Sequence, residues 1–177
     1  MEIVLIRHTT PDIAKGICYG QSDIPLAKTF EREAELIRIA LASGPFPDAV
    51  FSSPLSRCQQ LASFLSPASF QVDDRLMELH FGTWEMTAWN SIDPLQLDPW
   101  MRDFVHTPCP GGESYMQLYK RTSAFLDQLR MEPLERVWVI THGGVIRAAL
   151  AHCGDTTLEN SFDRKIGYGT ITRLHLS

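Results

Sequence analysis

The sequence is poor in cysteine and has no long apolar run. Its 177 residues include four cysteines, none of them in a CxxC pair: Cys18, Cys58, Cys109 and Cys153. This spacing argues against a zinc finger and predicts reduced thiols without a structural disulfide. No apolar stretch approaches the ~20 residues of a membrane-spanning helix, and the first residues form no basic and apolar leader. We therefore expect a cytoplasmic protein that does not enter a membrane.

Positive charge is also scarce. Lysine and arginine number 16 against 21 aspartates and glutamates, for a net charge of −5, and the arginines are scattered along the chain. A nucleic-acid partner is therefore not expected, because such proteins carry a clustered basic face. No two histidines lie one helical turn apart, which argues against a metallohydrolase. We expect no metal, no cofactor, and a single domain over residues 1–177.

The first candidate functional residues lie at the end of a predicted strand. Residues Ile3–Ile6 form an apolar run rich in β-branched side chains, as a strand covered on both faces needs, and Pro11 limits its length. Arg7 and His8 then lie at the carboxyl end of that strand. Ligands bind at this edge in open α/β sheets. A fixed cation beside an imidazole there suggests an anion site with a nucleophile or a base.

A later stretch repeats this pattern. Val137–Ile140 predicts a buried strand, His142 follows its end, and Gly143 opens a tight turn into a helix. Unpaired amides at such a helix start can hold an anion. Between the two stretches, Phe51–Ala62 predicts a strand end and a Ser-Pro helix start, with Arg57 one turn in. Two histidines and two arginines are therefore expected to meet at one sheet edge.

Periodicity predicts the remaining elements. The expected helices are Leu26–Leu41, Leu55–Leu65, Glu113–Arg130 and Val145–Cys153, and the further strands are Ala49–Phe51, Phe70–Val72 and Thr170–Leu176. The last strand alternates polar and apolar residues, which is typical of an edge strand with one side in water. Segment 81–110 is irregular and rich in tryptophan and proline. It is compatible with short helices that form a lid over the crevice, although aromatic side chains more often belong to a core.

Five motifs occur in order along the chain: Leu5–His8, Ser52–Arg57, Met77–Glu85, Gly111–Ser114 and Thr141–Arg147. In that order they resemble the histidine phosphatase superfamily, in its phosphoglycerate mutase-like branch, over nearly the whole chain. The resemblance implies an α/β fold, a three-layer α/β/α sandwich with a mostly parallel central sheet and an antiparallel edge strand. It also implies hydrolysis of a small-molecule phosphate ester.

The resemblance assigns roles to the strand-end residues. His8 attacks phosphorus and forms a phosphohistidine. Arg7 and Arg57 clamp the non-bridging oxygens, while His142 and the amide near Gly143 stabilise the charge of the transferring group. The arginines supply the charge that a metal ion would otherwise bring, so none is required.

A general acid must also protonate the leaving oxygen. Glu78 matches the family's acid position, and the same carboxylate can take a proton from water in the second step. Glu85 lies close in the sequence and is the alternative.

The chain departs from the family pattern at several positions. Ala14 stands where many relatives have a phosphate-binding asparagine, so Thr9, Thr10 or Gln21 is expected to supply a substitute donor. Met86 stands where glycine is usual, a change that the sequence alone does not explain.

Segment Gly16–Leu26 resembles the α-ribazole phosphatases, which implies α-ribazole 5′-phosphate, an intermediate of cobalamin assembly, as the substrate. Thr10, Tyr19, Gln21 and Trp84 are the residues expected to contact it, with aromatic stacking on its flat ring. The alternatives are a sugar-phosphate or broad small-molecule phosphatase, a phosphoglycerate mutase, and a binding module without turnover. The sequence gives no indication of oligomeric state.

Overall fold

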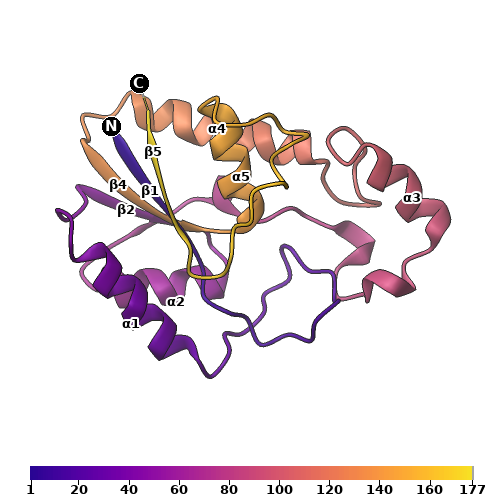
Figure 1. Cartoon of the computed structure of the whole chain (residues 1–177), viewed down its shortest axis with the longest axis horizontal. Helices are drawn as coiled ribbons and strands as arrows, with labels where there is room; N and C mark the ends of the chain where they lie inside the picture. The colour runs from indigo at the N-terminus through magenta and orange to yellow at the C-terminus, as the bar shows by residue number, and fades with distance from the viewer. Residues whose placement is uncertain (177) are drawn as a thin grey trace.

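The computed structural model describes residues 1–176 and contains a five-stranded sheet in the order β3-β2-β4-β1-β5 (Figure 1). The strands are β1 Glu2–Arg7, β2 Ala49–Ser52, β3 Gln71–Val72, β4 Arg136–Thr141 and β5 Ile171–His175. All neighbouring strands are parallel except β5, which pairs antiparallel with β1 at the edge. The apolar run of β1 is almost completely buried, as a central strand requires.

Helices cover both faces of the sheet. Helices α1 (Phe30–Leu41) and α2 (Ser56–Leu65) lie on one face, and α4 (Tyr115–Arg130) and α5 (Gly143–His152) lie on the other (Figure 1). Each face has its own hydrophobic core, because alternate residues of the strands point in opposite directions. The predicted three-layer α/β/α sandwich with a mostly parallel sheet and an antiparallel edge strand is confirmed.

The predicted boundaries lie within two residues of those in the structure, except for the start of α1. Helix α1 begins at Phe30 and not at Leu26. Leu26 forms a β-bridge with Pro11, and the next amide, that of Ala27, donates to the carbonyl of Thr10 at 2.9 Å. The chain is therefore extended through these residues, because pairing with the loop after β1 competes with helix formation.

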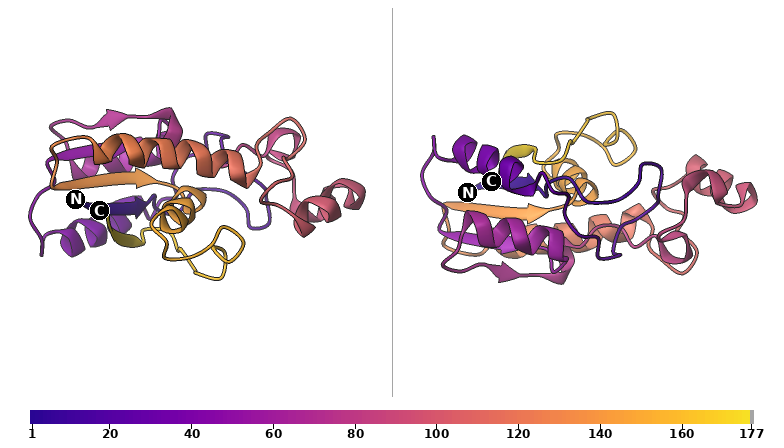
Figure 2. Two further views of the ribbon diagram at one scale, coloured as in Figure 1. Left: turned by 90° about the horizontal axis from the view of Figure 1, so that it is seen from above. Right: turned by 90° about the horizontal axis from the view of Figure 1, so that it is seen from below.

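Segment 81–110 contains three short helices, Gly82–Trp84, Trp89–Ser91 and α3 (Pro94–Arg102). In both views of Figure 2 this segment extends beyond the carboxyl ends of the central strands. Its tryptophans pack against one another, with ring centroids 5.5 Å apart for Trp84 and Trp100 and 6.0 Å for Trp89 and Trp100. These rings form the aromatic core of segment 81–110, which is continuous with the hydrophobic core on the α4 and α5 face of the sheet. That the segment moves as a lid stays a prediction.

Met86 adopts a backbone conformation that favours glycine. Its φ is +63°, in the left-handed region, and its side chain is 54% exposed.

Replacing Met86 by glycine should therefore raise the free energy of unfolding by about 1 kcal/mol, since it relieves the steric cost of the left-handed conformation. Thermal denaturation should show a rise in Tm of about 2–4 °C. Met131 is the control, since it is exposed with a φ of −86°. Met131→Gly should not raise Tm; an unchanged or lower Tm for Met86→Gly would contradict the explanation.

Candidate active site

The pairing of β1 with β4 brings the two histidine motifs together. Arg7 lies opposite Thr141 in the parallel ladder, and the amide of His8 donates to the carbonyl of Thr141 at 3.0 Å. The rings of His8 and His142 lie with centroids 5.1 Å apart. The carboxyl ends of the central strands thus bring both motifs to one edge of the sheet.

His8 is held as a neutral imidazole with a free electron pair on Nε2. Its Nδ1 lies 2.8 Å from the carbonyl oxygen of Thr9, which can only accept, so Nδ1 carries the proton. Its Nε2 accepts from Nε of Arg57 at 3.3 Å. Burial, and then the positive charges of Arg57 and Arg7, hold the pKa of His8 well below its ordinary value. His8 can therefore act as a nucleophile through Nε2.

Arg57 is completely buried in the first turn of α2. Besides its bond to His8, its guanidinium donates to the carbonyls of Gly20 and Ser22 in the loop after β1. The guanidinium is therefore fixed beside His8 by its backbone partners.

His142 lies beneath His8 and does not line the cavity. Its side chain is completely buried, with Nδ1 3.4 Å from Nη2 of Arg57 and Nε2 2.8 Å from Oγ of Ser53. Since Arg57 can only donate, Nε2 carries the proton and donates to Ser53. A direct contact of His142 with a phosphoryl group stays a prediction, and in this arrangement His142 contacts Arg57 and Ser53 instead of the cavity.

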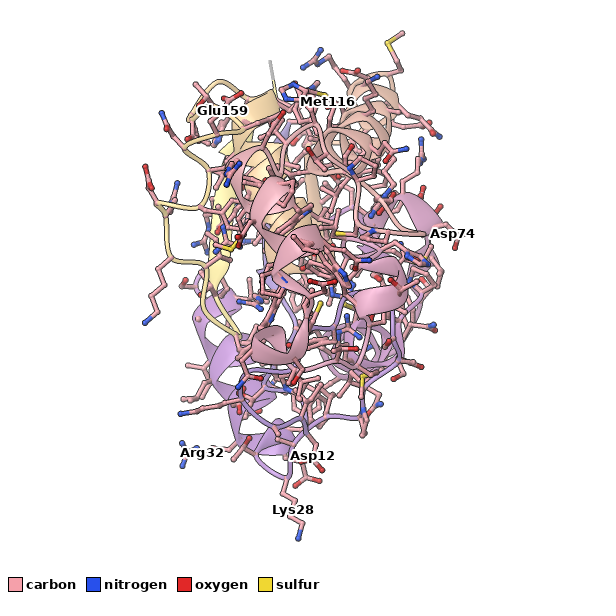
Figure 3. All side chains as sticks on the ribbon, turned by 90° about the vertical axis from the view of Figure 1, so that its right-hand side faces the viewer. Asp12, Lys28, Arg32, Asp74, Met116 and Glu159 are labelled. Carbon is pink, nitrogen blue, oxygen red and sulfur yellow. The ribbon has the colours of Figure 1, made fainter. Side chains whose placement is uncertain are left out.

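A cavity of about 230 Å³ opens above His8. Figure 3 looks onto this end of the molecule, where the loop that carries Asp12 and Lys28 lies at one edge and the segment that carries Glu159 lies at the opposite edge. The cavity is lined by Arg7, His8, Ile17, Tyr19, Arg57, Glu78, Leu79, Phe81, Trp89, Tyr115, Gly143, Gly144, Arg147, Phe162 and Tyr168. Among the charged groups in that set, three are guanidinium groups and one is a carboxylate, so the cavity suits an anion.

Arg7 lines the cavity and has one donor without a partner in the described part of the chain. One of its Nη atoms donates to the carbonyl of Ile166, and its guanidinium carbon lies 4.1 Å from the ring centroid of Tyr168. Its Nε is buried and has no partner within residues 1–176. Gly143, the first residue of α5, flanks the same guanidinium. An anion bound there would supply the missing acceptor.

Glu78 faces the cavity from the opposite wall. Its Oε2 accepts from the amide of Gly144 at 3.1 Å, and its backbone carbonyl accepts from Arg121 and Gln21. A Cβ on Gly144 would lie 2.2 Å from Oε1 of Glu78, so only glycine leaves room for this carboxylate. The position of this carboxylate in the cavity wall suits a group that exchanges protons with a ligand in the cavity.

Glu85 has a different place. Its carboxylate accepts from the amides of Gly20, Gln21 and Ser22 and from the hydroxyl of Ser22. Burial alone would raise the pKa of Glu85, but these donors outweigh it and the pKa is lowered. Glu85 therefore stays ionised and anchors the loop after β1, outside the cavity.

Of the four residues expected to contact the organic part of the substrate, only Tyr19 lines the cavity, where its hydroxyl lies 2.6 Å from that of Tyr168. Thr10 is turned away, because its amide and hydroxyl donate to Glu33. Gln21 instead supports the backbone at position 78.

Trp84 is also outside the cavity. It is buried in the aromatic core of segment 81–110, where its indole N–H donates to Gln96. Trp89 lies in the cavity wall in its place.

Ala14 stands where many relatives have a phosphate-binding asparagine, and Thr9 is a possible substitute donor, but neither residue lines the cavity. Ala14 is exposed, and Thr9 is buried with no hydrogen-bond partner for Oγ1 within residues 1–176.

The sequence analysis missed Arg147, Phe162 and Tyr168. Arg147 lies four residues after Gly143 on the same face of α5, so its place could have been inferred from helical periodicity. Phe162 and Tyr168 come from the irregular segment before β5, where no periodicity points to them.

Within the part of the chain that the structure describes, no three His, Cys, Asp or Glu side chains gather as metal ligands would. None of its helices is long and apolar enough to cross a membrane.

The buried histidines predict a pH-dependent stability. The pKa of His142 is held well below its ordinary value by burial and then by the neighbouring His8 and Arg57, as for His8 itself. An unfolded imidazole binds a proton below about pH 6.5, whereas these two do not until lower pH, so the unfolded state gains protons first. The free energy of unfolding should therefore fall as pH drops from 6.5, by up to about 1.4 kcal/mol per pH unit for each histidine.

Urea denaturation between about pH 7.5 and 5 measures this slope. His142→Gln should reduce it, and His106→Gln should not, because His106 is exposed. Stability that does not change over this range would contradict the buried neutral state.

Comparisons with known proteins agree with this geometry. The family model of the histidine phosphatase superfamily (branch 1) matches residues 3–177. The metal-independent phosphoserine phosphatase of Arabidopsis thaliana is 34% identical over 158 residues, which cover 83% of this chain and 66% of that protein. A mycobacterial glucosyl-3-phosphoglycerate phosphatase, solved in complex with VO3, has a TM-score of 0.85 at 26% identity, covering 98% of this chain and 92% of that one.

The α-ribazole phosphatase from Shigella flexneri has a TM-score of 0.89 at 23% identity, covering 100% of this chain and 91% of that chain, a likeness that bears on the fold. These similar proteins are phosphatases whose names give different substrates. The family match extends over nearly all residues, including the five motifs. The chain therefore belongs to the histidine phosphatase superfamily, branch 1.

Proposed function

We propose that the protein is a metal-independent phosphomonoesterase that works through a phosphohistidine on His8. One observation carries the proposal: a neutral imidazole with a fixed, unprotonated Nε2 borders a cavity that contains three guanidinium groups and one carboxylate. The name of the Arabidopsis relative, a metal-independent phosphatase, supports the absence of a metal from the reaction.

In the first step Nε2 of His8 attacks phosphorus, and the bond from phosphorus to the ester oxygen breaks. Arg7 and Arg57, with the amide of Gly143, hold the non-bridging oxygens and stabilise their charge. Glu78, in its protonated form, gives its proton to the leaving oxygen, which departs as a neutral alcohol.

In the second step water attacks the phosphohistidine. The carboxylate of Glu78 takes the proton from this water, the bond from nitrogen to phosphorus breaks, and Nε2 of His8 regains its electron pair. His142 contributes to both steps as a positioning residue, since its Nδ1 faces the guanidinium of Arg57. Neither step requires a cofactor.

The substrate is a small phosphate ester, and α-ribazole 5′-phosphate is one candidate. The loop after β1 and the aromatic side chains in the cavity wall, Tyr19, Phe81, Trp89 and Tyr168, support it because they suit a flat ring. Trp84, outside the cavity, gives no such support. Sugar phosphates are the alternative. Arg147, the third guanidinium in the cavity, favours esters whose alcohol part carries a second anionic group.

Phosphate release in the presence of a chelator tests the proposal. The panel contains α-ribazole 5′-phosphate, sugar phosphates, nucleotides and a chromogenic aryl phosphate, with the His8→Ala protein as the control. Turnover that survives the chelator and is lost in the control is expected. Turnover abolished by the chelator would favour a metallohydrolase, and no turnover on any ester would favour a binding module. The cytoplasm is the expected compartment, because all four cysteines are free thiols.

A further inference from the structure

Arg147 is a cation in the cavity that the proposed reaction does not use. It lies in α5, one turn after Gly143, and its guanidinium carbon lies 4.8 Å from the ring centroid of Phe162. Its Nε is buried and has no hydrogen-bond partner within residues 1–176, and no ion pair is formed by Arg147 in that part of the chain. A half-buried guanidinium without an anionic partner is costly, so the site is suited to an anion from outside the chain.

Arg147 lies beside the wall where the leaving group must lie. The amide of Gly144, three residues before it, binds the carboxylate of Glu78. Since Glu78 is the proposed acid for the ester oxygen, the alcohol part of a substrate lies next to it. A Cβ on Gly143 would lie 3.0 Å from Nη1 of Arg147 and 3.3 Å from Cζ of Arg7, so the two guanidinium groups flank the same glycine.

The charges in the cavity leave Arg147 unmatched. A phosphate monoester carries about two negative charges near neutral pH, which Arg7 and Arg57 balance. Glu78 is the carboxylate whose charge acts on Arg147, but the proposed first step needs Glu78 in its protonated form. In that step the third guanidinium has no counterpart in a substrate whose only anionic group is its phosphate. The cavity is also small, about 230 Å³, against roughly 300–1,000 Å³ for typical ligand sites, which favours a compact alcohol.

We propose that Arg147 binds a carboxylate on the alcohol part of the substrate, so that the enzyme prefers small phosphate esters of a hydroxy acid or an amino acid. A guanidinium binds a carboxylate through two parallel hydrogen bonds, and Arg147 lines the cavity where such a group would lie. The aromatic ring of Phe162 covers the other face of the guanidinium. This inference rests on the proposed phosphatase function of the same site.

Two esters that differ by one carboxylate test it: O-phosphoserine and O-phosphoethanolamine. The wild-type protein should have the higher kcat/KM on O-phosphoserine. Arg147→Met should lower that value by about 10- to 100-fold, mainly through KM, since it removes a charged hydrogen-bonded pair. The same variant should change kcat/KM on O-phosphoethanolamine by less than about 3-fold. Arg32→Met is the control, since Arg32 is exposed and does not line the cavity; Figure 3 shows it at the same edge as Asp12 and Lys28.

The outcomes separate the inference from the function on which it rests. Equal wild-type rates on both esters, or an equal loss on both in Arg147→Met, would overturn the inference and leave the phosphatase function in place. Absence of turnover on both esters would count against the proposed phosphatase function. In that case calorimetric binding of the same two esters to the His8→Ala protein, with and without Arg147→Met, still decides whether Arg147 recognises the carboxylate.

Discussion

Replacing His8 by alanine is expected to lower kcat/KM for every ester substrate by about four orders of magnitude or more. The reason is that Nε2 of His8 is the only nucleophile in the proposed first step. Arg57 and Arg7 cannot replace it, and the neighbouring His142 does not line the cavity. Folding should be preserved, because alanine removes only the imidazole ring. Arg7, Arg57 and Glu78 keep their hydrogen bonds to the backbone. Steady-state kinetics on a good aryl ester, where residual rates are measurable, gives the size of the loss.

His175→Ala is the matched control for that experiment. His175 is exposed in the edge strand β5, on the side that faces water, so its removal should leave kcat/KM within about 2-fold of the wild type. Residual activity in His8→Ala within about 10-fold of the wild type would contradict the role of His8 as nucleophile.

Glu78→Gln is expected to lower kcat/KM, which reports the first step and not the hydrolysis of the phosphohistidine, by about 10²–10⁴-fold on alkyl esters, because a glutamine cannot protonate the leaving oxygen. On an aryl phosphate, whose leaving oxygen needs little protonation, the first step should be much less affected. The ratio of the two losses therefore separates an acid role from a loss of binding. Equal losses on both esters would contradict the acid role of Glu78.

Gly144→Ala should produce a similar change without altering Glu78 itself. The new Cβ would lie 2.2 Å from Oε1 of Glu78, the end of a flexible side chain, so the carboxylate should move while the fold persists. A displacement of this size should cost about 10²-fold in kcat on alkyl esters. Gly167→Ala is the control, since its nearest neighbour would lie at 3.4 Å. An unchanged kcat in Gly144→Ala would contradict the proposal that the Glu78 carboxylate acts from its position beside Gly144.

The sheet edge was predictable from the sequence because its signals are local and physical. Ile3–Ile6 and Val137–Ile140 are apolar runs that only a covered strand accommodates, and polar residues follow each run directly. Parallel strands align their carboxyl ends, so Arg7, His8 and Thr141 had to become neighbours once the strands paired. The fold and the meeting of the motifs follow from these few residues.

The walls of the cavity were less predictable because they depend on contacts between distant segments. Trp84 and Trp89 lie in the same irregular stretch, and only the packing around α3 decides that Trp84 is buried and Trp89 faces the cavity. Thr10 was expected to face the substrate, but Glu33, in the first turn of α1, binds it. That contact forms because α1 begins later than periodicity suggests.

Phosphate trapped on His8 during turnover is the most direct test of the account. The protein is mixed rapidly with an ester substrate, quenched in alkali because phosphohistidine is labile in acid, and the modified peptide is identified by mass spectrometry. One phosphate is expected on His8, formed at the rate of the first step, and no modification is expected in the His8→Ala protein. Turnover without any phosphorylated residue, or phosphate on a residue other than His8, would contradict it.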